Sequence, residues 1–113
     1  MKTILLIALL AFAIPTAYAG GNAGAGADKA KPCAACHGAD FNTPTSADIP
    51  LLAGQHADYL ARALTDYKSG ERKNAVMNGQ TAKLSAQDIQ DLAAHIHGLK
   101  GKLKVIPLHR LVQ

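Results

Sequence analysis

The chain has 113 residues, a mass of 11.8 kDa, a formal net charge of +4 and 49% hydrophobic residues, with two cysteines and no tryptophan. This length accommodates one domain, and the globular composition excludes a disordered chain and a multispanning membrane protein. Only five residues are aromatic, and much of the remaining apolar content is alanine. An alanine-rich core is small, so we expect another group to fill it.

Residues 1–19 have the pattern of a secretory signal peptide. Lys2 supplies the positive charge, residues 4–14 form an uncharged apolar run, and small residues at 17 and 19 predict cleavage before Gly20. The run is too short to span a bilayer, which takes about 20 residues; an uncleaved membrane anchor is the alternative. The segment predicts export to an oxidising compartment.

The rest of the chain is read as three helices joined by two long loops, with no strand within 28–99. Residues 20–27 are predicted to be a flexible, glycine-rich lead-in. A short helix over 28–35 contains Pro32, which either lies in the first turn of a restarted helix or kinks it. Prolines, glycines and small polar residues predict an ordered loop over 38–54.

The second and third helices have clearer boundaries. Apolar residues at helical spacing predict a helix over 56–69, which Gly70 ends. Residues 70–84 are predicted to be the second loop. Ser85 and Asp88 have the spacing of a capping box and begin the last helix, which extends to about residue 99. Because long loops in a small domain usually serve a site, this all-α arrangement suggests a bound group.

The residues Cys33-Ala34-Ala35-Cys36-His37 form the C-x-x-C-H pattern of covalent haem attachment. The two thiols add across the two haem vinyl groups, and His37 supplies an imidazole nitrogen as the proximal iron ligand. Two alternatives remain open. The cysteines could form a thiol–disulfide redox pair, although the strand–helix alternation typical of such proteins is missing, or they could join a zinc site, which needs further ligands.

Met77 is the candidate for the second axial ligand. It is the only methionine besides the initiator, and it lies in the predicted 70–84 loop, which can reach the other face of a haem. A methionine can also simply fill a core, but a polar loop is a poor place for one. The rival ligands are His56, His95, His97 and His109.

A haem would also supply the missing core volume. The residues expected to pack around it share large apolar side chains: Leu51, Leu52, Leu60, Leu64, Tyr67, Leu84, Ile89 and Leu92.

The sequence resembles the class I cytochromes c, and among them the bacterial c4/c5-type, c553-like domains. The matching stretches are 33–40, 49–56, 59–74, Met77 and 84–94, so the resemblance covers about residues 28–99. It implies an all-α class I fold wrapped around one covalent haem c, with Cys33 and Cys36 attached to it and His37 and Met77 as axial ligands. It also implies that the carbonyl of Pro50 accepts a hydrogen bond from His37.

Three departures from this family stand out. Pro32 interrupts the helix before the motif, Phe41 occupies a position where the family commonly has glycine, and His95-Ile96 replaces a usual aromatic pair. Members of the c4 group carry two haem domains, whereas this sequence has one C-x-x-C-H motif.

Residues 100–113 form a basic tail with four lysines or arginines and no acid, while residues 20–99 have eight acids against seven bases. The tail is either loosely attached or a docking element for a partner or a membrane surface. Export and the nearly neutral body disfavour nucleic-acid binding. We therefore expect a soluble periplasmic electron carrier rather than an enzyme, with redox proteins, including membrane respiratory complexes, as partners; a haem subunit of a larger complex is the alternative.

Overall fold

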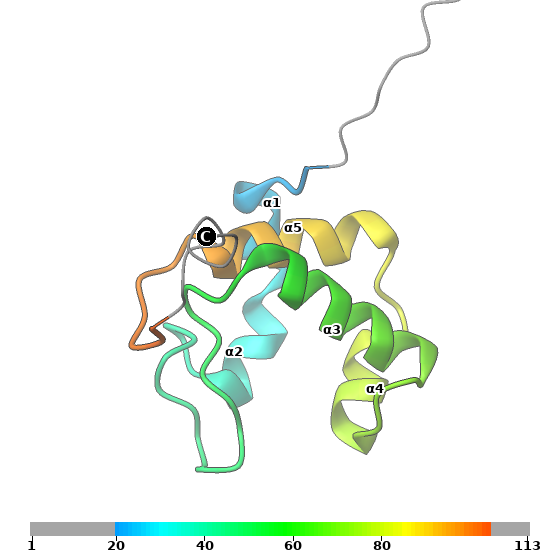
Figure 1. Ribbon diagram of the computed structural model, residues 1–113, viewed down its shortest axis with the longest axis horizontal. Helices are drawn as coiled ribbons and strands as arrows, with labels where there is room; N and C mark the ends of the chain where they lie inside the picture. The colour runs from blue at the N-terminus through cyan, green and yellow to red at the C-terminus, as the bar shows by residue number, and fades with distance from the viewer. Residues whose placement is uncertain (1–19, 105–113) are drawn as a thin grey trace, which may run out of the picture.

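The computed structural model describes residues 20–104, and within that range the only regular secondary structure is α-helix. The five helices are α1 (Ala23–Lys29), α2 (Lys31–His37), α3 (Ala57–Ser69), α4 (Ala75–Thr81) and α5 (Ala86–His97). In Figure 1, α1 packs along α5 and α3 contacts both α5 and α4. Within the described range no helix has the length and apolar character needed to cross a membrane. The predicted signal peptide and residues 105–113, with His109, lie outside it.

The prediction of a flexible lead-in over residues 20–27 was wrong from residue 23 onward, where α1 begins. Asn22 caps α1 by accepting a hydrogen bond from the backbone nitrogen of Ala25 (3.0 Å). A Cβ atom at Gly21 would collide with the carbonyl of Gln90, and one at Gly26 with that of Asp91. The glycines therefore let the α1 backbone approach α5 closely, which composition alone does not reveal.

Other boundaries agree with the sequence or differ from it for local reasons. Pro32 lies in the first turn of a separate helix, α2, so the helix restarts there and is not kinked. α3 begins at Ala57, one residue after the predicted start, with His56 as its N-cap, and Gly70 ends it as predicted, in the left-handed conformation at φ +83°. Ser85 and Asp88 form the predicted capping box of α5.

The predicted 70–84 loop contains an additional helix, α4. Asn74 caps it by accepting a hydrogen bond from the backbone nitrogen of Met77 (3.0 Å). This helix is only seven residues long and includes the dipeptide Asn78-Gly79, which is a turn signal. Contacts with α3 stabilise it, and such contacts are not visible to local sequence patterns.

The core lies among α1, α3 and α5, and it is as alanine-rich as the composition suggested. Its buried apolar members are Ala30, Phe41, Ala53, Leu60, Ala61, Ile89, Leu92, Ala93 and Ile96. The predicted tail is attached at its start, because the backbone nitrogen of Lys102 donates to the side-chain oxygen of Asn42 (2.9 Å). The expected division between domain and tail at residue 99 is therefore not sharp.

Asp91 joins the first and last helices through a buried carboxylate, 3% exposed. Its oxygens accept from Lys29 Nζ (2.6 Å), the backbone nitrogen of Asn22 (2.7 Å) and Gln87 Nε2 (2.8 Å). The hydrogen bond from Lys29, followed by those from Asn22 and Gln87, lowers the pKa of Asp91 to about 2. The same lysine also pairs with Asp88 (2.8 Å).

Gly26→Ala is expected to destabilise the protein, because the added methyl group overpacks the α1–α5 contact. Overpacking of this kind costs about 1–3 kcal/mol, which thermal unfolding of the purified protein measures. Gly79→Ala on α4 is the matched control, since a Cβ there meets open space. An equal effect of the two substitutions would contradict the proposed close approach.

The free energy of unfolding is expected to fall as the pH drops from about 4 to about 2. The folded-state pKa of Asp91 lies below its unfolded value, so its contribution is present above about pH 4 and is lost as the carboxylate is protonated. Asp91→Asn should lower stability at neutral pH and make this loss shallower, as measured by urea unfolding at several pH values. Asp66→Asn, which removes an exposed pair with Arg62, is the control.

Candidate functional site

A cavity of about 610 Å³ lies between α2 and the 38–54 loop on one side and α3 and α4 on the other. Its volume is in the range of small-molecule and cofactor sites. Five residues expected to surround a haem line it: Leu51, Leu52, Leu60, Leu64 and Tyr67. Ile89 and Leu92 instead lie in the helical core, and Leu84 packs against that core.

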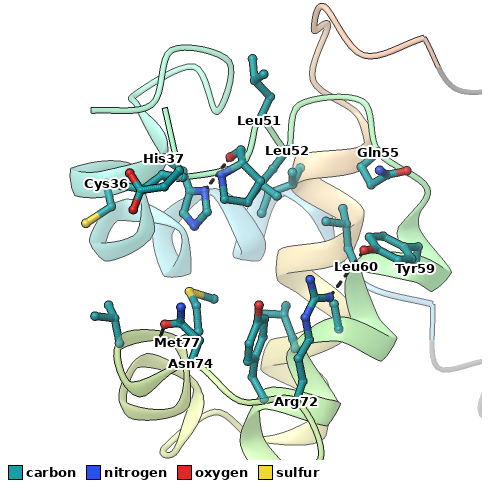
Figure 2. Close-up of a pocket in the computed structure, with 18 residues that line it drawn as sticks. Cys36, His37, Leu51, Leu52, Gln55, Tyr59, Leu60, Arg72, Asn74 and Met77 are labelled. Carbon is teal, nitrogen blue, oxygen red and sulfur yellow. Dashed lines mark hydrogen bonds between the residues drawn. The ribbon is translucent and has the colours of Figure 1, made fainter. Parts of the chain in front are cut away.

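His37 forms one wall of the cavity. It ends α2, its side chain is buried, and its Nδ1 is 2.9 Å from the carbonyl oxygen of Pro50. A carbonyl only accepts hydrogen bonds, so in the neutral imidazole Nδ1 carries the proton and Nε2 has the lone pair. Figure 2 shows the ring of His37 projecting into the cavity from the wall opposite Met77. The contact with Pro50 is the one that the resemblance implied.

Met77 projects into the cavity from the opposite wall, on α4 rather than on a loop (Figure 2). Asn78, the next residue, holds this helix in place. Its Nδ2 donates to the carbonyls of Tyr67 (2.6 Å) and Arg72 (2.9 Å), and its Oδ1 accepts from the backbone nitrogen of Asn74 (2.9 Å). One side chain thus links the end of α3, the following turn and the start of α4.

Cys33 and Cys36 are both free thiols on α2, and Cys36 lies at the cavity. Burial raises the pKa of the Cys33 thiol. A redox-active cysteine pair requires the opposite, a lowered pKa that favours the thiolate. Among residues 20–104 there is also no cluster of three or more His, Cys, Asp or Glu suited to a metal ion. Neither the thiol–disulfide nor the zinc alternative gains support.

The rival histidines within the described residues do not line the cavity. His56 is the N-cap of α3. The ring of His95 meets that of Phe41 edge-on, with centroids 6.3 Å apart. The Nδ1 of His97 lies 2.8 Å from the carbonyl oxygen of Gln55. Each of these side chains has a place outside the cavity.

Arg72 is a cavity residue that the sequence analysis did not single out. Its guanidinium lies 4.8 Å from the centre of the Tyr67 ring, and its Nη1 is 3.5 Å from the hydroxyl oxygen of Tyr59. This contact with Tyr59 raises the pKa of Arg72. Figure 2 shows Arg72 and Cys36 at opposite ends of the cavity. The only sequence signal for Arg72 was its position in a basic, polar turn.

The cavity fits a haem by the chemistry of its walls. A buried imidazole with a free nitrogen faces a thioether, two free thiols lie on the helix that carries the imidazole, and the lining between them is largely apolar. Arg72 adds a cation in the wall for a group that carries carboxylates.

Comparison with known proteins agrees with this fit. A family model described as cytochrome c matches residues 22–100. The chain belongs to the cytochrome c family. Membership implies a covalently bound haem c, and the all-helical structure has the class I cytochrome c fold. The start of the match at residue 22 also places α1 inside the cytochrome c domain.

Two bacterial relatives are similar to this chain over most of its length. A cytochrome c4 of Pseudomonas aeruginosa is 42% identical over 101 residues, which are 88% of this chain and 50% of that protein. A thiosulfate dehydrogenase electron acceptor of Thiomonas intermedia is 36% identical over 111 residues, 96% of this chain and 49% of that protein. The chain thus spans about half the length of these relatives.

A solved structure is also similar to this chain over about half of its own length. The crystal structure of reduced recombinant cytochrome c4 from Pseudomonas stutzeri superposes with a TM-score of 0.69 at 39% identity, over 74% of this chain and 48% of that one. The cytochrome c fold therefore accounts for the helices that build the cavity.

Asn78→Ala is expected to loosen α4, because it leaves two backbone carbonyls and one backbone nitrogen without their partner. Loss of such hydrogen bonds costs about 1–3 kcal/mol. Thermal unfolding and amide hydrogen exchange in α4 measure the effect. Gln80→Ala, an exposed residue of the same helix, should leave both unchanged. Equal exchange in the two variants would contradict the role assigned to Asn78.

Proposed function

We propose that this cytochrome c carries single electrons between redox partners in the periplasm, with one haem c attached at Cys33 and Cys36 and with His37 and Met77 as axial iron ligands. One observation carries the proposal: a buried histidine, whose Nδ1 hydrogen-bonds to the Pro50 carbonyl, faces a methionine side chain across a largely apolar cavity, with the free thiol of Cys36 at the cavity and that of Cys33 on the same helix. When bound, the haem supplies a one-electron Fe(III)/Fe(II) couple.

Residues of the chain would set the reduction potential of the Fe(III)/Fe(II) couple. The hydrogen bond from His37 to the Pro50 carbonyl fixes the tautomer and the ring orientation and makes the imidazole a stronger donor. The Met77 thioether favours the reduced state and therefore a relatively high potential. With haem bound, the apolar lining would keep water away from the iron, and ligation by His37 and Met77 would leave no position for a substrate, which favours electron transfer over catalysis.

The partner is proposed to be another redox protein, and a dehydrogenase is the best supported kind. The Thiomonas relative is by name an electron acceptor of thiosulfate dehydrogenase. The export pattern of residues 1–19 supports a periplasmic location, and the basic residues 100–113 offer a docking segment for an acidic partner or membrane complex. Function as a haem subunit of a larger complex remains the second candidate, and size-exclusion chromatography of the native material separates the two.

Covalent attachment is tested by the absorption spectrum of the reduced, denatured protein, which should show haem c. The haem should also remain on the chain in denaturing mass spectrometry, with one haem per chain. Cys33→Ala and Cys36→Ala should each leave a single thioether. A denatured chain without haem would end the proposal and restore the thiol–disulfide alternative.

Met77→Ala is expected to open the sixth position of the iron. Cyanide then has no methionine to displace, so its affinity for the ferric protein should rise by about tenfold or more, equivalent to about 1.4 kcal/mol, and the midpoint potential should fall. Gln80→Ala on the same helix is the control. An unchanged low-spin spectrum and unchanged cyanide affinity would show that another side chain is the sixth ligand.

A further inference from the structure

Phe41 has an unusual backbone for its residue type. Its φ is +55°, and no other non-glycine residue in the described range has a positive φ. Such a conformation is disfavoured for a bulky L-residue, and a glycine would adopt it without strain. The surrounding structure must therefore hold Phe41 in place.

The ring of Phe41 is one of the contacts that hold it. The residue is 3% exposed, and its ring stacks on the imidazole of His37 with centroids 6.5 Å apart and planes 16° apart. On another side it meets the ring of His95 from α5 at 86°. Both arrangements are favourable aromatic geometries. The ring thus joins the end of α2 to α5 and lies against the side chain that faces the cavity.

The carbonyl of Phe41 is the second contact. It accepts hydrogen bonds from the backbone nitrogens of Leu52 and Ala53, both at 2.9 Å. Leu52 and Ala53 lie two and three residues after Pro50, whose carbonyl accepts from His37 Nδ1. The ring of Phe41 therefore stacks with the imidazole, and its carbonyl anchors the segment that carries the imidazole's hydrogen-bond acceptor.

We propose that Phe41 is a positioning residue for His37, which sets the imidazole plane and the strength of its Nδ1 hydrogen bond and, through them, the potential of the iron. This inference rests on the proposed function, in which His37 is an iron ligand. An imidazole that is free to rotate, or whose acceptor has moved away, donates less electron density to the metal. Loss of Phe41 then stabilises the ferric state less and raises the midpoint potential.

The test compares Phe41→Leu, Phe41→Gly and Leu92→Ala in the holoprotein. Phe41→Leu keeps most of the apolar volume but removes the stacked ring, whereas Phe41→Gly removes the ring and keeps the backbone conformation without strain. Leu92 is buried in the same core but does not line the cavity, so its truncation measures destabilisation alone. The readouts are the midpoint potential, the exchange rate of the His37 Nδ1 proton by NMR of the reduced protein, and the melting temperature.

Both Phe41 variants are expected to exchange the Nδ1 proton about tenfold faster or more, since exchange follows local opening, and Phe41→Leu should raise the potential. Leu92→Ala should lower the melting temperature and leave both other readouts unchanged. If the Phe41 variants lose only thermal stability, Phe41 is core packing and the inference is wrong. Where Phe41→Gly fails to fold, Phe41→Leu decides. The wild-type spectrum distinguishes failure of the proposed function from failure of the inference about Phe41. A wild type without histidine-ligated haem refutes the proposed function before any variant is compared.

Discussion

A hydrogen bond from Nδ1 of His37 to the carbonyl of Pro50 determines which imidazole nitrogen faces the cavity. Because that carbonyl can only accept, the nitrogen on the cavity side is left with its lone pair. Everything around this contact serves to keep it: α2 brings the ring to the wall, the 38–54 loop brings the acceptor, and Phe41 contacts both. The chemistry proposed for the site depends on this arrangement.

The high alanine and glycine content explains why the helical core is small and why the protein has room for a cavity. Alanines and glycines allow α1 and α5 to approach closely, so the helical core is compact and small. Several of the larger apolar side chains, such as Leu51 and Leu64, line the cavity. We therefore expect the folded protein to gain much of its apolar packing from the bound haem rather than from its own side chains.

The opposite wall is held by polar contacts rather than by packing. Asn74 caps α4, and Asn78 links that helix to the end of α3 and to the turn between them. A seven-residue helix has little stability of its own. The position of Met77 thus depends on two asparagines that a sequence reading takes for loop residues.

The sequence by itself determined the helical class, the approximate limits of α3 and α5 and the C-x-x-C-H motif with His37, because caps, helical periodicity and motif spacing are local signals. It also named Met77 as a candidate ligand, and the family resemblance implied the contact between His37 and Pro50. Only the tertiary structure decided that residues 23–29 and 75–81 are helical and that Phe41 and Arg72 belong to the site. Those features depend on contacts with partners distant in sequence, such as the α5 backbone, the ring of His37 and the aromatic rings of α3, which no local pattern encodes.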